Sequence, residues 1–258
     1  MAALPHAIAC FTFDNMGEAA ELGAGALPVP QPRALHPSLS RGYPRIFDLL
    51  ERHAVRATFF VEGWNGLHHP DAVAEIVRRG HELGMHGFLH ERWSSLSPGE
   101  QTQLSARATD ALSQAAGVRP RGFRAPGGAR TPQTEGILLA LGYAYDASLG
   151  SGMRPERLAQ GLAQVPFVWP CVDGFHYLRE PPAKPEEVRE AWLRALARTA
   201  CEGGLFVTVC HAFVTGLEPA RIEVLGDVMA AAAADPRVSV MQVGEVAQLL
   251  LADSAVGA

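Results

Sequence analysis

Short apolar runs alternate with amphipathic segments along nearly the whole chain, and this alternation limits the folds open to it more than any other feature. The runs are rich in β-branched and aromatic residues, which favour strands, and the segments between them, about ten to twenty residues long, have helical periodicity. We predict strands at Ala7–Phe13, Ala57–Val61, Glu82–Met85, Gly122–Arg124, Tyr143–Asp146, Val165–Val168, Leu205–Val209 and Val238–Met241. We predict helices at Tyr43–His53, Asp71–Arg79, Pro98–Ala116, Pro132–Leu141, Pro185–Cys201, Pro219–Ala234 and Gly244–Leu251.

Repeated β-α units predict an α/β fold in which about seven or eight parallel strands close into a (β/α) barrel. The 258 residues, 48% of them hydrophobic, suit one barrel domain over residues 1–258. One segment breaks the pattern, because residues 15–40 are heavy in Gly, Pro and Ala and too long for an ordinary loop between a strand and a helix. We expect this segment to be a long lid over the site or an interface loop.

Charge and hydropathy exclude two classes of partner. The net charge is −5 and the arginines are spread among acids, so no basic surface for a nucleic acid is predicted. No apolar run approaches the roughly 18 residues that a membrane span requires. Met1 to Phe13 also lacks the features of a secretory signal. We therefore expect a cytoplasmic protein that binds a small-molecule substrate, and the sequence leaves open whether it forms a homo-oligomer.

Polar side chains follow the predicted strands at the points where the strands end. Because sites in such barrels lie on loops at the carboxyl ends of the strands, we expect these side chains to gather at one mouth of the barrel. They are Asp14 and Asn15 after the first strand, and then Glu62, His86, Arg124, Asp146, Trp169 and His211 after the second to the seventh.

Three histidines, His81, His86 and His90, lie within one stretch of ten residues. The four-residue step from His86 to His90 lets both imidazoles face one point, which is half of a metal site. The alternative for this pair is a set of hydrogen-bonded or exposed histidines with no ligand role. His81 is predicted only to close the preceding helix, and His68 and His69 are predicted to lie in a surface loop.

Three other strand-end side chains suit acid–base chemistry. Asp14 can act as a general base, and a guanidinium such as that of Arg124 would keep it ionised and oriented. His211, after an apolar run, is a candidate general acid that protonates a leaving nitrogen. Taken singly, each also has an ordinary structural role, as a capping aspartate, a surface arginine and a buried histidine.

Five motifs follow one another in a set order along the chain: Asp14-Asn15, His86-Gly-Phe-Leu-His90, Arg124-Ala-Pro-Gly-Gly128, Tyr145-Asp146-Ala-Ser148 and Val209-Cys210-His211. Together they resemble the polysaccharide deacetylase family, the NodB-homology carbohydrate esterases. The runs Ala57–Trp64 and Val165–Trp169 are closest to its peptidoglycan-deacetylase-like, allantoinase-like and cyclic-imidase subgroup. The resemblance implies a distorted (β/α)7-8 barrel of the NodB-homology type that hydrolyses a C–N amide bond with one divalent metal.

The resemblance also implies roles for individual residues. Position 15, occupied by Asn15, would hold the metal together with His86 and His90. Asp14 would take a proton from the attacking water, and His211 would protonate the departing nitrogen.

Asn15 departs from the family pattern, which has a second aspartate there as a metal ligand. An amide oxygen can still coordinate a metal, but it brings no negative charge. Zinc is the expected metal, its affinity should be reduced, and cobalt, nickel, manganese or no metal at all become alternatives. Glu18 is near enough in sequence to replace Asn15 as a ligand.

Two further acidic residues, Asp146 and Asp173, match the family motifs only in part. The motif around Asp146 is thin, since Leu149 and Gly150 replace the usual aspartate and tryptophan, so we predict a structural, orienting role for Asp146. Asp173 is predicted either to bind substrate or to pair with His211.

Aromatic residues near the predicted mouth are candidates for substrate binding. Phe88, Trp93 and Trp169 are predicted to wall the cleft and stack on a sugar or another ring. The alternative is that they belong to the core.

Three functions remain open on the sequence alone. The first is N-deacetylation of a sugar-like or other small polar molecule by a metal-dependent amidohydrolase. The second is hydrolysis of a cyclic amide, imide or ureide, which releases no acetate. The third is a degenerate barrel that binds without turnover, which Asn15 and the thin Asp146 motif would explain.

Overall fold

The structure is a computed structural model that describes residues 4–27 and 36–253. The strands in these ranges form one sheet in the order β6-β7-β5-β4-β3-β2-β1-β8, with β9 also paired to β1. They are β1 (Ala7–Asp14), β2 (Thr58–Val61), β3 (Glu82–Met85), β4 (Gly122–Phe123), β5 (Tyr145–Asp146), β6 (Glu156–Arg157), β7 (Ala163–Gln164), β8 (Gly204–His211) and β9 (Val238–Val240). Apart from β6 and β7, which are antiparallel, the paired strands are parallel.

Strand β1 pairs with three other strands of the sheet. On one side it pairs with β8 over its whole length, and on the other its first residues pair with β9 and its last with β2. All eight residues of β1 are buried. A strand covered on both faces explains the nearly continuous apolar run in the sequence.

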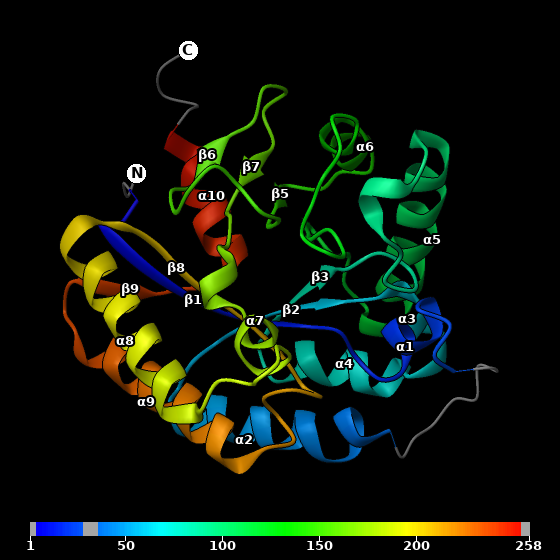
Figure 1. Cartoon of the computed structure of the whole chain (residues 1–258). Coiled ribbons are helices and arrows are strands. Elements are labelled where there is room, and N and C mark those ends of the chain that lie inside the picture. The colour runs from blue at the N-terminus through cyan, green and yellow to red at the C-terminus, as the bar shows by residue number, and fades with distance from the viewer. Residues whose placement is uncertain (1–3, 28–35, 254–258) are drawn as a thin grey trace.

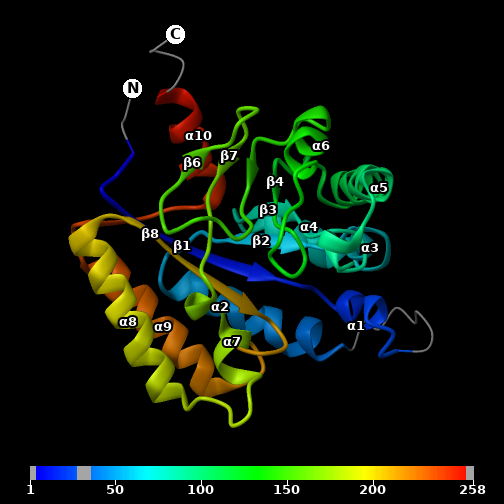
Figure 2. The same ribbon diagram turned by 45° about the horizontal axis from the view of Figure 1, so that its top comes forward.

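The sheet curls into a distorted barrel, as Figures 1 and 2 show, and the predicted fold class is confirmed. The barrel is open on one side. Between β7 and β8 the described residues form no strand ladder, and only the isolated bridge between Val172 and Val209 joins the segment after β7 to β8.

Helices cover the outside of the sheet. They are α1 (Ala19–Gly23), α2 (Tyr43–Arg52), α3 (Gly63–His68), α4 (Pro70–Arg78), α5 (Pro98–Ala116), α6 (Thr134–Ala140), α7 (Asp173–Tyr177), α8 (Pro185–Glu202), α9 (Pro219–Ala234) and α10 (Val243–Asp253), with short turns η1 (Ser38–Gly42), η2 (Trp93–Ser95) and η3 (Trp169–Cys171). Helices α8 and α9 lie side by side, with α8 against β1 and β8 and α2 next to α9, while α3, α4 and α5 pack together beyond β2 and β3 (Figures 1 and 2).

Local signals explain why long helices such as α5 were predicted with the correct bounds. The Ser97 hydroxyl accepts a hydrogen bond from the Glu100 N–H, and the Glu100 carboxylate accepts one from the Ser97 N–H, which is a capping box. The helix ends at Gly117, whose φ of +69° is a left-handed conformation that glycine adopts without strain.

The short elements α1, β6 and α7 were not predicted, and two further differences from the predicted secondary structure have a clear physical reason. The predicted strand Val165–Val168 lies beyond the true strand β7, because Pro166 has no N–H to donate to a ladder. Helix α3 was not predicted, because its Gly63 and Gly66 suggest a break in any helix. In the fold both glycines face α5, where a larger side chain would not fit.

The predicted lid or interface loop, residues 15–40, is partly regular. Its residues 28–35 lie outside the described residues. The rest includes α1 and most of η1, so the segment is not irregular throughout. Its role as a lid or an interface stays a prediction.

Within residues 4–27 and 36–253, no helix combines the length and the apolar character that crossing a bilayer would demand.

The close approach of α3 to α5 gives a test of the packing. Alanine is the better helix former by about 1 kcal/mol, but a Cβ at position 63 would lie 2.4 Å from the Cα of Ala108. We expect Gly63→Ala to lower the free energy of unfolding, measured in urea, by about 1–3 kcal/mol. Gly99→Ala in the first turn of α5, where no atom lies within 4 Å of the added Cβ, is the control and should not be destabilised. A Gly63→Ala variant as stable as the wild type would contradict this packing.

Candidate active site

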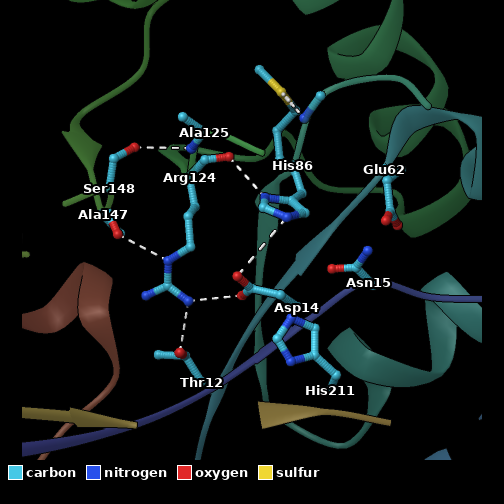
Figure 3. Close-up of polar contacts among 12 residues, drawn as sticks. Thr12, Asp14, Asn15, Glu62, His86, Arg124, Ala125, Ala147, Ser148 and His211 are labelled. Carbon is cyan, nitrogen blue, oxygen red and sulfur yellow. Dashed lines mark hydrogen bonds and ion pairs between the residues drawn. The ribbon is translucent and has the colours of Figure 1, made fainter. Parts of the chain in front are cut away.

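The ends of strands β1, β2, β3 and β8 lie at one mouth of the barrel. Asp14 is opposite His211 in the β1–β8 pairing. Glu62 and His86 each follow the last paired residues of β2 and β3, Val61 and Met85. Figure 3 shows four of the predicted strand-end side chains lying close together there: Asp14, His86, Arg124 and His211.

Arg124 crosses the inside of the barrel and holds Asp14. Its side chain is only 1% exposed; Nη1 donates to Asp14 Oδ1 and to Thr12 Oγ1, both at 2.7 Å, and Nε donates to the Ala147 carbonyl at 2.9 Å. The guanidinium lies 4.2 Å from the centre of the Phe60 ring. Burial alone would raise the pKa of Asp14, but the charge of Arg124 holds this pKa below its usual value. Asp14 is therefore an ionised, oriented carboxylate, as a general base must be.

His86 and His90 are neutral and close together. His86 Nδ1 donates to the Arg124 carbonyl at 2.9 Å, so its Nε2 carries the free lone pair, and this Nε2 lies 3.9 Å from Asp14 Oδ2. Burial lowers the pKa of His86 to about 3 and also lowers the pKa of His90. The two ring centres are 5.0 Å apart. Metal sites use neutral imidazoles, and His86 also has the second nitrogen held by a partner, as metal-ligating histidines usually do.

Asn15 adds an oxygen atom without a partner. Its side chain is buried, and Oδ1 makes no hydrogen bond in the described parts of the chain. A buried acceptor of this kind calls for a ligand, a cation or a water. Across residues 4–27 and 36–253, no three His, Cys, Asp or Glu side chains are arranged to hold a metal. The available donors are thus two imidazoles, those of His86 and His90, and one neutral amide, and donors of these types suit a divalent metal.

Glu18 does not replace Asn15, so that alternative was wrong. Its Oε2 lies 3.0 Å from His69 Nε2, and both side chains are buried. The prediction that His69 lies in a surface loop was wrong for the same reason.

Asp173 holds the side chain of His211 at the end of β8. Its Oδ1 lies 2.6 Å from His211 Nδ1, while Oδ2 accepts from the His211 N–H and from Thr215 Oγ1, both at 2.7 Å. Burial would lower the pKa of His211, but the charge and hydrogen bond of Asp173 outweigh it and raise this pKa. The predicted substrate-binding role of Asp173 was wrong, since its carboxylate is fully buried and both oxygens are engaged. The pairing with His211 is the alternative that the structure contains.

Asp146 organises the loop that follows β4. Its Oδ1 accepts from the hydroxyl of Ser148 at 2.6 Å, and that hydroxyl accepts from the N–H of Ala125 at 2.9 Å. Its Oδ2 lies 3.2 Å from Arg130. These contacts are compatible with a structural, orienting role for Asp146, which stays a prediction.

A cavity of about 160 Å³ opens among these side chains. Its polar wall consists of Asp14, His86, His90, Arg124 and His211, and its apolar wall includes Phe167, Trp169, Val172 and Val209. A larger hollow of about 410 Å³ lies at the other end of the strands, beside Glu82, away from all the strand-end residues. The smaller cavity is therefore the candidate active site.

Only one of the three aromatic residues predicted to bind substrate lines this cavity. Trp169 is 43% exposed and stands at its edge. Trp93 is fully buried, with its Nε1 donating to Thr134, and Phe88 is buried beneath Arg107. The prediction was wrong for Trp93 and Phe88, which belong to the core.

Comparison with known families and structures agrees with this geometry. A family model described as polysaccharide deacetylase matches residues 7–145, which is more than half of the chain.

The chain belongs to the polysaccharide deacetylase family.

Individual relatives share parts of the sequence or the whole fold. A peptidoglycan deacetylase of Helicobacter pylori is 29% identical over 108 residues, which cover 42% of this chain and 37% of that protein. A crystal structure from Mycobacterium smegmatis, described as that of a polysaccharide deacetylase, has a TM-score of 0.85 at 28% identity and covers 97% of this chain and 92% of its own. The allantoinase PuuE has a TM-score of 0.78 at 17% identity, covering 96% and 91%, and shares the fold.

Sequence reasoning assigned no role to several residues that shape this polysaccharide deacetylase site. Glu62 was noted only as a strand-end residue, yet it is fully buried, one of its oxygens has no partner in the described residues, and burial raises its pKa to about 8. Tyr43, Thr12 and Ser148 hold the site through hydrogen bonds to the Asn15 carbonyl, the Arg124 guanidinium and the Ala125 N–H. No sequence pattern marks such bonds, because they join segments that are far apart in the chain.

The Asp173–His211 pair predicts the direction in which the pKa of His211 changes when Asp173 is replaced. Asp173→Asn keeps the size of the side chain and removes the charge that raises the pKa of His211, so this pKa should fall. We expect NMR titration of the imidazole to detect the fall, and the alkaline limb of any pH–rate profile that needs protonated His211 should move to lower pH. Asp146→Asn, which changes another buried carboxylate, should leave the His211 pKa in place. An unchanged His211 pKa in Asp173→Asn would exclude this coupling.

Proposed function

We propose that this chain is a metal-dependent amidohydrolase that removes the N-acetyl group from a sugar-like or other small polar substrate. The convergence of three parts on one cavity supports it: an ionised carboxylate at Asp14, the neutral pair His86 and His90, and a histidine of raised pKa, His211. Hydrolysis of an amide needs a base, an electrophile and an acid in this arrangement. Membership of the polysaccharide deacetylase family supports the same reaction.

In the proposed reaction each side chain has a separate role. His86, His90 and Asn15 would hold a divalent metal, which when bound would polarise the amide carbonyl and make water a better nucleophile. Asp14, kept ionised by Arg124, accepts a proton from the attacking water. His211 protonates the leaving nitrogen through Nε2, since its Nδ1 is held by Asp173.

The size of the cavity restricts the substrate. A cavity of about 150 Å³ holds one six-membered ring, so the 160 Å³ here admits an acetamido group or one small ring. The rest of a sugar would lie outside, where the exposed face of Trp169 is placed to stack on it. A cyclic amide or ureide also fits this volume, and ring opening is therefore the second candidate function. A cytoplasmic location stays a prediction from the sequence, which leaves the oligomeric state open.

A product analysis tests the proposal. Protein loaded with zinc, cobalt, nickel or manganese is incubated with N-acetylated sugars and with cyclic amides, and acetate and ring-opened products are measured. We expect acetate release, and Asp14→Asn should reduce its rate by about 10²- to 10⁴-fold. Asp71→Asn, on the exposed first turn of α4, is the matched control and should keep full activity. Ring opening without acetate would favour the second candidate, and no product with any metal would favour a non-catalytic binding barrel.

The neutral ligand at position 15 predicts a gain of affinity on substitution. Asn15→Asp adds the charge that the amide lacks, and aspartate tolerates a φ of +64° as asparagine does. We expect zinc binding, measured by calorimetry, to become about tenfold tighter or more, which is about 1.4 kcal/mol. Asn15→Leu, which has no donor atom, should bind more weakly than the wild type. Equal zinc affinity in all three proteins would show that position 15 does not touch the metal.

A further inference from the structure

The peptide bond between Asn15 and Met16 is held at both of its polar atoms. The Tyr43 hydroxyl donates to the Asn15 carbonyl at 3.0 Å, and the Met16 N–H donates to Glu62 Oε2 at 3.1 Å. Both holding side chains are buried, Tyr43 to 3% exposure and Glu62 to 0%. We call Tyr43 and Glu62 the peptide clamp.

The two halves of the peptide clamp come from different elements. Tyr43 begins α2, whereas Glu62 follows β2, the strand between β1 and β3. The strand register thus places Glu62 between the segment that carries Asn15 and the segment that carries His86. The amide of Asn65 donates to the same Glu62 oxygen at 2.9 Å and fixes it from the side of α3.

The clamped peptide determines where the Asn15 side chain points. Asn15 has a φ of +64°, and fixing both polar atoms of the following peptide keeps the residue in this left-handed conformation. In Figure 3 the Asn15 amide lies between Glu62 and the Asp14–His86 pair, with its oxygen towards the pair. That oxygen is buried and has no partner in the described residues, so it is free to bind a ligand.

We propose that Tyr43 and Glu62 are positioning residues that aim the Asn15 amide oxygen at the metal position beside His86 and His90. The inference rests on the proposed function, in which Asn15 is a ligand. What Glu62 contributes is an acceptor atom at Oε2, which the carbonyl oxygen of a glutamine also supplies. Replacing Glu62 by glutamine should therefore preserve the orientation of the Asn15 amide oxygen. Methionine is similar in length but has no acceptor, so it should lose this orientation.

Cobalt binding, measured by calorimetry and by visible absorption, tests the proposal. Glu62→Met should weaken binding by about 10- to 100-fold, the usual effect of losing a residue that orients a ligand. Tyr43→Phe, which removes one oxygen atom, should weaken it by at least about threefold. Glu62→Gln should bind within about threefold of the wild type.

A second set of variants shows whether the clamp acts through Asn15. In an Asn15→Ala background, neither Glu62→Met nor Tyr43→Phe should weaken cobalt binding any further, because the oxygen that they aim is absent. The control is Glu82→Met, which removes another largely buried carboxylate, one that accepts bonds from Thr58 and Tyr145 at the opposite end of the strands. It should lower stability and leave cobalt affinity unchanged.

Each contrary result has its own meaning. Wild-type cobalt affinity in Glu62→Met and Tyr43→Phe would overturn the positioning role. Equal losses of cobalt affinity with and without the Asn15 side chain would do the same. So would a Glu62→Gln variant that binds cobalt as weakly as Glu62→Met. If Glu62→Met does not fold, Tyr43→Phe carries the same comparison. Failure of the wild type itself to bind cobalt, zinc, nickel or manganese would overturn both the metal-dependent function and the clamp, and this result is distinct because it precedes any substitution.

Discussion

The buried ion pair between Arg124 and Asp14 is the interaction on which the rest of the site depends. Removing both charges from water costs several kcal/mol, and the pair offsets this cost only through good geometry and further hydrogen bonds. Arg124 has both, since it also bonds Thr12 and the Ala147 carbonyl and lies over the ring of Phe60. One side chain therefore links β1, β4 and the loop after β5, and its ion pair with Asp14 keeps that buried carboxylate ionised.

The fold could be predicted from the sequence wherever a local rule applies. Helix α5 has its own capping box and terminal glycine, and β1 is a long apolar run, so both were predicted almost to the residue. Helix α3 could not be predicted, because its glycines are explained only by the backbone of α5 against which they lie. The misplaced strand near Pro166 shows the same limit, since an apolar run does not reveal which of its residues form the ladder.

The site could be predicted as far as strand ends determine it. In a parallel sheet the residues after each strand meet at one edge, so Asp14, His86, Arg124 and His211 converge as predicted. Burial of individual side chains does not follow from this rule. Trp93 and Trp169 were both predicted to line the cleft, yet one is fully buried and the other is 43% exposed. Hydrogen bonds between distant segments, such as that of Tyr43 to the Asn15 carbonyl, cannot be predicted from the sequence either.

The neutral side chain at position 15 changes what the protein must supply. A carboxylate is attracted to a cation over several ångströms and can adjust to it, because the interaction of two charges falls only slowly with distance. The attraction of an amide dipole falls more steeply, so an amide must already point in the right direction. The buried hydroxyl of Tyr43 and the buried carboxyl of Glu62 provide that direction by fixing the next peptide. In the proposed metal site, geometry built from α2 and the end of β2 thus compensates for the charge that Asn15 lacks, which would explain why the fully buried Glu62 stands beside an uncharged side chain.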